Sequence, residues 1–317
     1  TENVVAPIVE RESDRVLGES IGVASNPEFL TEGRAVRDFM EPDRIVIGVS
    51  DPHSEHVLSD LYATFGNVPK VVVNPRTAEM IKYASNALLA TMISFSNELA
   101  NVGAALGDVD AAEVMRGVHA SQYLTTRTAS GDVTANLASF LYAGCGFGGS
   151  CLPKDVTALA AYGSQFGVPT PLLDAVLDVN RRQPDVLVDL IRTEANDLAS
   201  STVAVLGLAF KPDTSDVRES PAFPVIRALA PLVGHLRAHD PLVRPDDLPE
   251  DVSHAIEFTD DLTAVVEGSD VLIIVTSWSE YLSIPEMIAP KSQQPLIVDG
   301  RRMLDPSSVA RYRGIGF

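Results

Sequence analysis

Residues 202–210 read Thr-Val-Ala-Val-Leu-Gly-Leu-Ala-Phe, an apolar run that continues into a glycine-bearing turn. Such a short apolar run is typical of a strand that is buried on both faces of a parallel sheet. Strand-like runs and helical patterns alternate after it, with strands expected at His235–Ala238, Asp270–Thr276 and Pro295–Val298 and helices at 221–233 and 260–268. This alternation indicates a Rossmann-like α/β domain over residues 201–317.

The turn at Gly207 suggests what this domain binds. It keeps only a remnant of the G-x-G-x-x-G sequence, which by itself is a weak signal for a dinucleotide. Its position directly after a strand still favours a nucleotide or phosphate at the carboxyl edge of the sheet.

The first 75 residues contain a shorter form of the same alternation. Strand-like runs are expected at Ile21–Ala24, Arg44–Val49 and Lys70–Val73, with helical stretches between them. No opening strand with a G-x-G-x-x-G turn comes before them. We therefore expect residues 1–75 to be the closing part of an α/β domain, a partial Rossmann-like remnant.

A helical region separates the two α/β parts and is expected over residues 76–200. Apolar residues surround almost the whole circumference of the stretch 77–102, which predicts a buried helix. A second helical stretch covers 171–198, and Pro184 is expected to kink it or to begin a new helix. The polar stretch Ser121–Ala143 predicts an ordered loop or a short insertion.

Charge and composition exclude several classes of protein. The 317 residues include 43 acidic and 24 basic ones, a net charge of −19, which argues against a nucleic-acid partner. The longest apolar runs are far too short to span a bilayer, so we expect no membrane partner. Two cysteines provide no disulfide framework and no zinc pattern, which favours the cytoplasm and no metal site. The acidic surface fits a high-salt cytoplasm and an ordinary acidic protein equally well.

The stretch Gly-Phe-Gly-Gly-Ser-Cys-Leu-Pro-Lys-Asp at residues 146–155 is the strongest chemical signal. Cys151 lies on a glycine-rich loop just before Pro153, which we expect to be the first residue of a helix. The positive end of the helix dipole and the charge of Lys154 both favour the thiolate, the form that attacks carbonyl carbon. A lone cysteine in a tight turn would be read as structural, but these neighbours favour a nucleophile.

Two further pairs of residues combine charge with helical spacing. Lys82 and Asn86 stand four residues apart on the apolar helix and therefore point the same way. A lysine there requires a partner, and an ion pair to a nearby carboxylate is the structural alternative to a chemical role. Glu28 and Glu32 are also four apart, and they suit either a helix start or acid–base chemistry.

In their order along the chain, these segments resemble the UDP-glucose/GDP-mannose dehydrogenase family, which oxidises a nucleotide-sugar alcohol to a uronic acid. The resemblance covers nearly the whole chain. Its motifs are Asn26–Gly33, Asp43–Gly48, Glu79–Ala87, the cysteine loop, Gly207–Ser220 and Val298–Arg302. It implies a central helical dimerisation domain over 76–200 and a C-terminal UDP-binding domain over 201–317. The implied homodimer is joined through the helix near 171–198.

The resemblance implies an NAD-dependent four-electron oxidation, most simply of UDP-glucose to UDP-glucuronate. Cys151 would hold the aldehyde as a thiohemiacetal, which the second oxidation turns into a thioester. Lys82 would face the developing oxyanion with Asn86 beside it. Asp155 and Glu28 would handle protons and water during hydrolysis.

The resemblance also implies which residues bind the substrate and the cofactor. The predicted substrate-binding residues are Phe29, Leu30, Glu32, Phe140, Tyr142, Gly148, Phe210, Lys211, Arg301 and Arg302. The residues assigned to the NAD cofactor are Arg218 and Lys154. No residue is assigned to a metal.

Two departures from the family pattern limit what the resemblance implies. Most of the NAD-binding domain is expected to be lacking, so the chain alone is expected to be inactive, and NAD and NADP are not distinguished. Arg127 in the 121–139 segment does not align with the family arginine that reaches a neighbouring subunit's substrate. GDP-mannose and the UDP-N-acetylhexosamines therefore remain alternative substrates.

Two rival functions come from other classes. A non-catalytic nucleotide-sugar-binding or dimerisation fragment would need no thiol, so the presence of Cys151, Lys82, Asn86 and Asp155 together argues against it. A thioester-forming hydrolase would use Cys151 without a cofactor. It lacks a histidine in the recognised motifs, and His119 is interpreted as structural.

Overall fold

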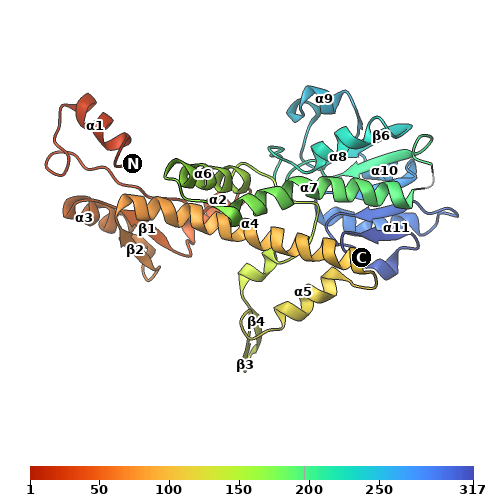
Figure 1. Cartoon of the computed structure of the whole chain (residues 1–317), viewed down its shortest axis with the longest axis horizontal. Helices are drawn as coiled ribbons and strands as arrows, with labels where there is room; N and C mark the ends of the chain where they lie inside the picture. The colour runs from red at the N-terminus through yellow and green to blue at the C-terminus, as the bar shows by residue number, and fades with distance from the viewer. Residues whose placement is uncertain (196) are drawn as a thin grey trace. The chain divides into compact units, whose positions relative to one another are not determined.

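The computed structural model describes residues 1–195 and 197–317, so Asn196, inside the predicted helical stretch 171–198, lies outside the described residues. These residues divide into two compact units, Thr1–Asn86 and Ala87–Phe317. Figure 1 shows the elements of both units along the chain.

The first unit contains a two-stranded parallel sheet with helices beside it. Strand β1 (Ile45–Gly48) pairs in parallel with β2 (Lys70–Val73), which confirms two of the three predicted strands. The expected strand at Ile21–Ala24 is wrong, because this segment forms only isolated bridges at Ile21 and Ser25. The helices of the unit are α1 (Val5–Ser13), α2 (Ala35–Met40), α3 (Pro52–Leu61) and the short 3₁₀ helix η1 (Tyr62–Phe65).

Helix α4 (Pro75–Leu106) is the longest helix of the chain that the structure describes. The prediction that it is buried all round is wrong. Leu88, Phe95 and Val102 are each about half exposed, although Ala90 and Ala100 are fully buried. The exposed residues recur every seven positions and therefore form one stripe of the helix. An apolar circumference allows burial on every face, but only neighbouring elements can provide it.

The stretch between the long helices is more regular than the sequence suggested. Helix α5 (Ala111–His119) leads into an antiparallel hairpin of β3 (Thr125–Thr128) and β4 (Gly131–Thr134), followed by the 3₁₀ helix η2 (Asn136–Phe140). The expectation of a loop at 121–143 is therefore corrected. The run of threonines around the Ala-Ser turn was an available hairpin signal.

Helices α6 (Leu152–Gln165) and α7 (Pro171–Glu194) follow the hairpin. Helix α7 is continuous and carries Pro184 in its interior, so the prediction that Pro184 begins a new helix is wrong. Pro184 is itself buried, as are Leu187, Val188 and Ile191 on the following turns. Tertiary packing over the last turns of α7 thus offsets the hydrogen bond that the proline cannot donate.

A six-stranded, fully parallel sheet forms the C-terminal part of the second unit. Its strand order is β10-β9-β8-β5-β6-β7, the doubly wound order of Rossmann domains. Strands β5 (Thr202–Leu206), β6 (His235–His239), β8 (Val271–Ile274) and β9 (Leu296–Asp299) agree with the prediction. The short edge strands β7 (Glu257–Phe258) and β10 (Tyr312–Gly314) were missed, because two or three residues carry too little periodicity.

Helices cover this sheet and complete its core. The predicted helices at 221–233 and 260–268 correspond to α8 (Ala222–Leu229) and α10 (Leu262–Glu267). Shorter elements are η3 (Pro245–Asp247), α9 (Glu250–Ser253), η4 (Ser279–Ser283), α11 (Ile284–Ile288) and η5 (Pro306–Ser308). Helix α7, green in Figure 1, packs against α8 and β9, so it joins the helical segment to the sheet.

Candidate functional site

The cysteine loop lies at the start of α6. Cys151 is the residue that precedes the helix, and its backbone carbonyl accepts a hydrogen bond of 2.9 Å from the N–H of Asp155. Helix α6 begins at Leu152, so Pro153 is its second residue rather than its first. Cys151 is an exposed free thiol. Its position at the amino end of a helix, open to solvent, is the environment in which a thiol can act as a nucleophile.

The carboxylate of Asp155 lies one turn into the same helix. Asp155 is only 2% exposed, and its Oδ1 is 2.8 Å from Nζ of the exposed Lys154. A buried carboxylate requires such pairing, because an uncompensated charge is costly away from water. The predicted acid–base residue and a predicted cofactor-binding residue therefore form one ion pair beside the cysteine.

The second cysteine has a different environment. Cys145 is fully buried, and its Sγ lies 3.5 Å from the carbonyl oxygen of Val275. Burial raises the pKa of the Cys145 thiol, while the nearby Arg301 acts in the opposite direction with a smaller effect. Cys145 is therefore a protonated core residue at neutral pH, and of the two thiols that of Cys151 is the one exposed to solvent.

The glycines of the loop allow it to lie against the edge of the six-stranded sheet. A Cβ atom on Gly148 would stand 2.2 Å from the carbonyl oxygen of Glu219. At Gly149, which has a φ of +81°, a Cβ would stand 2.7 Å from the Phe210 ring. The N–H of Gly149 donates to the Arg218 carbonyl at 2.9 Å. The structure thus brings the predicted residues Gly148, Phe210 and Arg218 together with the cysteine loop.

The carboxyl edge of this sheet holds the other predicted nucleotide-binding residues. Lys211 follows β5, and its Nζ lies 5.7 Å from the centre of the Phe210 ring. Arg301 follows β9 and donates to the carbonyl oxygens of Val275 and Gly146. The edge lies at the point where strand order reverses between β5 and β8, the usual ligand site of doubly wound sheets.

Arg302 differs from Arg301 in its surroundings. Its guanidinium makes a 2.9 Å ion pair with Asp110, and its side chain is only 9% exposed. It also lies 5.0 Å from the centre of the Phe317 ring. These contacts connect α5 to the end of the chain, so Arg301 is the better placed of the two to meet a ligand.

A second candidate cluster lies in the first unit. The Lys82 ammonium is 3.0 Å from Glu28 Oε1, so the lysine has the carboxylate partner of the structural alternative, and that carboxylate belongs to a predicted site residue. The ring of Phe29 lies near two cations, with the Arg44 guanidinium carbon 3.7 Å and Lys82 Nζ 5.5 Å from its centre. Asn86 is buried one turn further along α4. Arg44 was not among the predicted residues, although an arginine next to an aromatic motif was an available signal.

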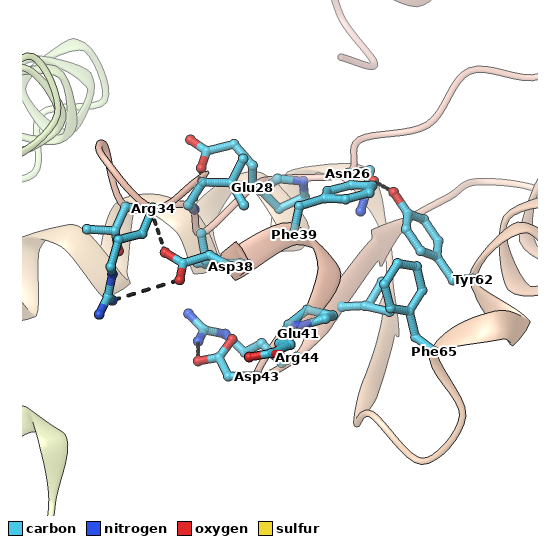
Figure 2. Close-up of a pocket in the computed structure, with 16 residues that line it drawn as sticks. Asn26, Glu28, Arg34, Asp38, Phe39, Glu41, Asp43, Arg44, Tyr62 and Phe65 are labelled. Carbon is cyan, nitrogen blue, oxygen red and sulfur yellow. Dashed lines mark hydrogen bonds and ion pairs between the residues drawn. The ribbon is translucent and has the colours of Figure 1, made fainter. Parts of the chain in front are cut away.

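This cluster borders a cavity of about 280 Å³ that includes Glu28, Phe29 and Leu30 in its wall. Figure 2 shows the aromatic side of the cavity, where the Tyr62 hydroxyl donates to the Asn26 side chain. On the charged side, Arg34 pairs with Asp38, and Arg44 pairs with Asp43 at 2.7 Å. Hydrogen bonds from Thr31 hold the pKa of the Asp38 carboxyl below its usual value. Glu32 is exposed and is not part of the cavity wall.

The remaining predicted residues lie near the hairpin. Tyr142 is half exposed, and its ring meets that of His119 edge-on with centres 4.9 Å apart. Phe140 ends η2 and is partly buried. Arg127 lies in β3, where it pairs in register with Asp132 and is exposed. His119 thus serves in ring packing, consistent with the structural interpretation.

In the turn after β5, the backbone N–H groups donate hydrogen bonds to a carboxylate of the same chain. Leu208 and Ala209 donate to one oxygen of Asp240, at 2.8 and 3.0 Å, and Trp278 Nε1 donates to the same oxygen at 3.1 Å. Asp240 is fully buried directly after β6. In a dinucleotide-binding turn such N–H groups hold a diphosphate. An internal carboxylate takes that place here, so this turn is closed to a dinucleotide.

Neither a membrane helix nor a metal cluster is found in the part of the chain that the structure describes. None of its helices is both long and apolar enough to cross a membrane. Over residues 1–195 and 197–317, no group of three or more His, Cys, Asp or Glu side chains is arranged to hold a metal ion.

The fold and the site define a doubly wound α/β protein in which an exposed thiol lies beside the ligand edge of the sheet. Three models of one family match the chain: the NAD binding domain over residues 1–66, the central domain over 76–182 and the UDP binding domain over 204–306. The chain belongs to the UDP-glucose/GDP-mannose dehydrogenase family. The match at 1–66 corrects in part the expectation that the NAD-binding domain is mostly lacking.

Relatives with the same domains support this assignment. The UDP-glucose 6-dehydrogenase AglM of Haloferax volcanii is 38% identical, and the match covers 100% of this chain and 70% of that protein. TuaD of Bacillus subtilis, a UDP-glucose 6-dehydrogenase, is 38% identical over 92% of this chain and 61% of its own length. A UDP-glucose dehydrogenase structure from Pyrobaculum islandicum is 36% identical with a TM-score of 0.86, covering 100% of this chain and 68% of that one. The chain thus spans between 61% and 70% of the length of these relatives.

Proposed function

We propose that the protein oxidises the primary alcohol of a nucleotide sugar to a carboxylate, with NAD as hydride acceptor and UDP-glucose as substrate. The observation that carries this proposal is the exposed Cys151 at the start of α6, on a loop that packs against Phe210 and the 218–219 backbone. The names of the relatives that are 38% identical support UDP-glucose as the sugar.

Cys151 accounts for the retention of the aldehyde between two oxidations. Its sulfur adds to the aldehyde carbon, and the thiol proton ends on the carbonyl oxygen, which gives a thiohemiacetal. Each oxidation sends one hydride to NAD⁺, and the second leaves a thioester. Water then attacks the thioester carbon, so the carboxylate forms and the thiol is restored. Asp155 is proposed to manage the protons of that step, supported by its burial one turn from Cys151.

The Lys82–Glu28 pair is proposed to stabilise charge and move protons at the sugar carbon. An ammonium next to a developing alkoxide lowers the energy of that charge. The 3.0 Å contact with Glu28 gives Lys82 a partner that can take up or return a proton. Asn86, on the same face of α4, is proposed to orient the lysine.

Binding roles are proposed for the aromatic and basic side chains around these groups. Arg302 is proposed to support binding of the nucleotide sugar. The residues proposed to bind the nucleotide sugar directly are Phe29, Leu30, Glu32, Phe140, Tyr142, Gly148, Phe210, Lys211 and Arg301. The NAD diphosphate is assigned to Arg218, with Lys154 near the reacting end. Arg218 suits this role, because its guanidinium is held by Asp216 at 2.6 Å on the wall of a cavity of about 610 Å³.

The larger organisation is proposed in the same way. Residues 1–75, 76–200 and 201–317 are proposed as the NAD-binding part, the central domain and the UDP-binding domain. A homodimer through α7 and a cytoplasmic location are also proposed. The exposed Leu172, at the start of α7, supports the dimer, and the two free thiols support a reducing compartment.

The test is NADH formation by the full-length protein with UDP-glucose, beside a Cys151→Ser variant. We expect two NADH per sugar from the wild type. The variant lacks the thiol, so its formation of the carboxylate should fall about 10³-fold or more, with no more than one NADH per sugar. Turnover with GDP-mannose or a UDP-N-acetylhexosamine instead would change the sugar and keep the chemistry. No NADH from any of these sugars would contradict the proposal, and binding without turnover would then favour a nucleotide-sugar-binding module.

A further inference from the structure

The segment Gly144–Phe147, which leads into the cysteine loop, is hydrogen-bonded along its backbone by three side chains and one backbone carbonyl of other segments. The carboxamide of Asn180, in the middle of α7, makes two of these bonds. Its Oδ1 accepts from the N–H of Phe147 at 2.8 Å, and its Nδ2 donates to the carbonyl of the same residue at 3.0 Å. One side chain thus satisfies both backbone groups of a residue four positions before Cys151.

The other bonds to this segment come from α4 and from the carboxyl edge of the sheet. Asn97 Oδ1, fully buried, accepts from the N–H of Gly144 at 2.7 Å. The N–H of Cys145 donates to the Gly300 carbonyl at 2.9 Å. Arg301 Nη1 donates to the Gly146 carbonyl at 3.0 Å. The segment is therefore held from the helices on one side and from the sheet on the other.

Gly146 makes the approach to Asn180 possible. Its φ is +101°, and a Cβ atom there would lie 2.9 Å from Asn180 Oδ1 and 3.5 Å from the Asn180 carbonyl oxygen. That carbonyl has no donor four residues on, because Pro184 has no N–H. Side chain and backbone of Asn180 therefore both face the loop at the point where α7 carries its proline.

Resting on the proposed function, we propose that Asn180 is a positioning residue, which sets the place of the Cys151 thiol through the backbone of Phe147. Asn180 touches neither the sulfur nor, on this proposal, the substrate. A displacement of the thiol by about 1 Å can lower the rate of its reaction roughly 10²-fold. The two hydrogen bonds between Asn180 and Phe147 form the tether of the loop. The first hydride transfer needs no thiol, so loss of the tether leaves that step unchanged and weakens capture of the aldehyde.

The experiment compares Asn180→Ala with Asn101→Ala in the full-length protein. Asn101 is a matched control, because its amide makes a 3.3 Å hydrogen bond to Gln183 of α7 and, among the described residues, none to the loop. We expect Asn180→Ala to lower kcat for formation of the carboxylate about 10- to 100-fold, with KM for the sugar within twofold. It should also release aldehyde that hydroxylamine can trap. Asn101→Ala should lower Tm by a similar amount while keeping kcat within twofold and releasing no aldehyde.

Several outcomes would overturn this inference. One is an unchanged kcat with no trapped aldehyde in folded Asn180→Ala, and another is an equal loss of kcat in both variants. Asn180→Asp adds a second test, since it keeps the acceptor for the Phe147 N–H and loses the donor to its carbonyl. An Asp variant that reacts like wild type would contradict the two-bond tether.

Failure of the proposed function is recognised separately. If the wild type forms no NADH with any of the three sugar classes, the tether is tested by the rate at which iodoacetamide alkylates Cys151, with Cys151→Ser as the blank. We expect this rate to differ at least threefold between Asn180→Ala and wild type, and to be equal in Asn101→Ala and wild type. Equal rates in all three would overturn the inference.

Discussion

The two parallel sheets of the chain contain similar apolar strands, but these strands differ in how far they are buried. Strands β5, β8 and β9 of the six-stranded sheet are apolar, and almost every residue in them is buried. Strand β2 reads Lys-Val-Val-Val, yet Val71 and Val72 are 37% and 40% exposed. Its partner β1 is buried throughout. An apolar strand is therefore buried only where strands and helices cover both of its faces.

The largest effect is expected at the carboxyl edge of the six-stranded sheet. Replacing Asp240 by Ala removes the acceptor of the N–H groups of Leu208, Ala209, Leu242 and Val243 and of Trp278 Nε1. Leaving buried donors unsatisfied should lower the free energy of unfolding by roughly 3–5 kcal/mol. Trp278 is the single tryptophan and is buried in this domain, so its fluorescence during urea unfolding reports on it. Asp240→Asn, which keeps one acceptor oxygen, should cost clearly less, and equal costs would contradict the account.

A matched pair of core substitutions compares the sheets directly. Ile273 in β8 and Ile47 in β1 are both fully buried. Each replacement by Ala should cost about 2–5 kcal/mol if both sites are packed to the same density. Trp278 fluorescence measures the first loss, and hydrogen exchange of the amides at 45–48 measures the second. A cost for Ile47→Ala below about 1 kcal/mol would show that β1 can collapse around the lost atoms, unlike β8.

The pH dependence of stability should carry a contribution from the six-stranded sheet. Burial lowers the pKa of His239 below its usual value, although Glu280, Asp240 and Asp260 oppose the shift. The unfolded chain therefore takes up this proton first as pH falls below about 6.5, and the folded state loses stability there. Between pH 7.5 and 5.5, urea unfolding should show a decrease of at most about 1.4 kcal/mol per pH unit from this group.

His239→Asn is the control for that decrease, and it should flatten the curve over the same interval. The carboxyl groups with lowered pKa, such as Asp51 and Asp251, lose their contribution only at more acidic pH. A decrease that persists unchanged in the variant would contradict the assignment to His239.

The smallest effect is expected on the exposed strand. Val72→Ala in β2 removes little buried surface and should change stability by no more than about 0.5 kcal/mol. Hydrogen exchange of the β1–β2 amides provides the measurement. A loss comparable to that of Ile47→Ala would mean that β2 is covered in solution by a surface outside the described chain.

The strands that the sequence predicted well are of four or five residues, and most of them, such as β5, β8 and β9, carry at least three apolar residues. The expected strand at Ile21–Ala24 failed because pairing depends on a neighbour, and this segment reaches β1 only through the bridge from Ser25 to Gly48. The residues of the candidate site likewise fall into those that the sequence predicted and those that it missed. Cys151, Lys82 and Glu28 were predicted as site residues from chemistry and spacing, but the ion pair between Lys82 and Glu28 was not. Asn180, Asn97 and Asp240 were missed because they act on backbone groups far away in the sequence.

The sequence by itself determined the family and most of the alternation of strands and helices, because these depend on residue type and local spacing. Only the tertiary structure decided that α4 exposes an apolar stripe and that α7 continues as one helix past Pro184. It also decided that the turn after β5 is closed by Asp240 and that Asn180 binds the cysteine loop. The Asp240 and Asn180 hydrogen bonds join residues more than 30 positions apart, and such contacts leave no periodic trace in the chain.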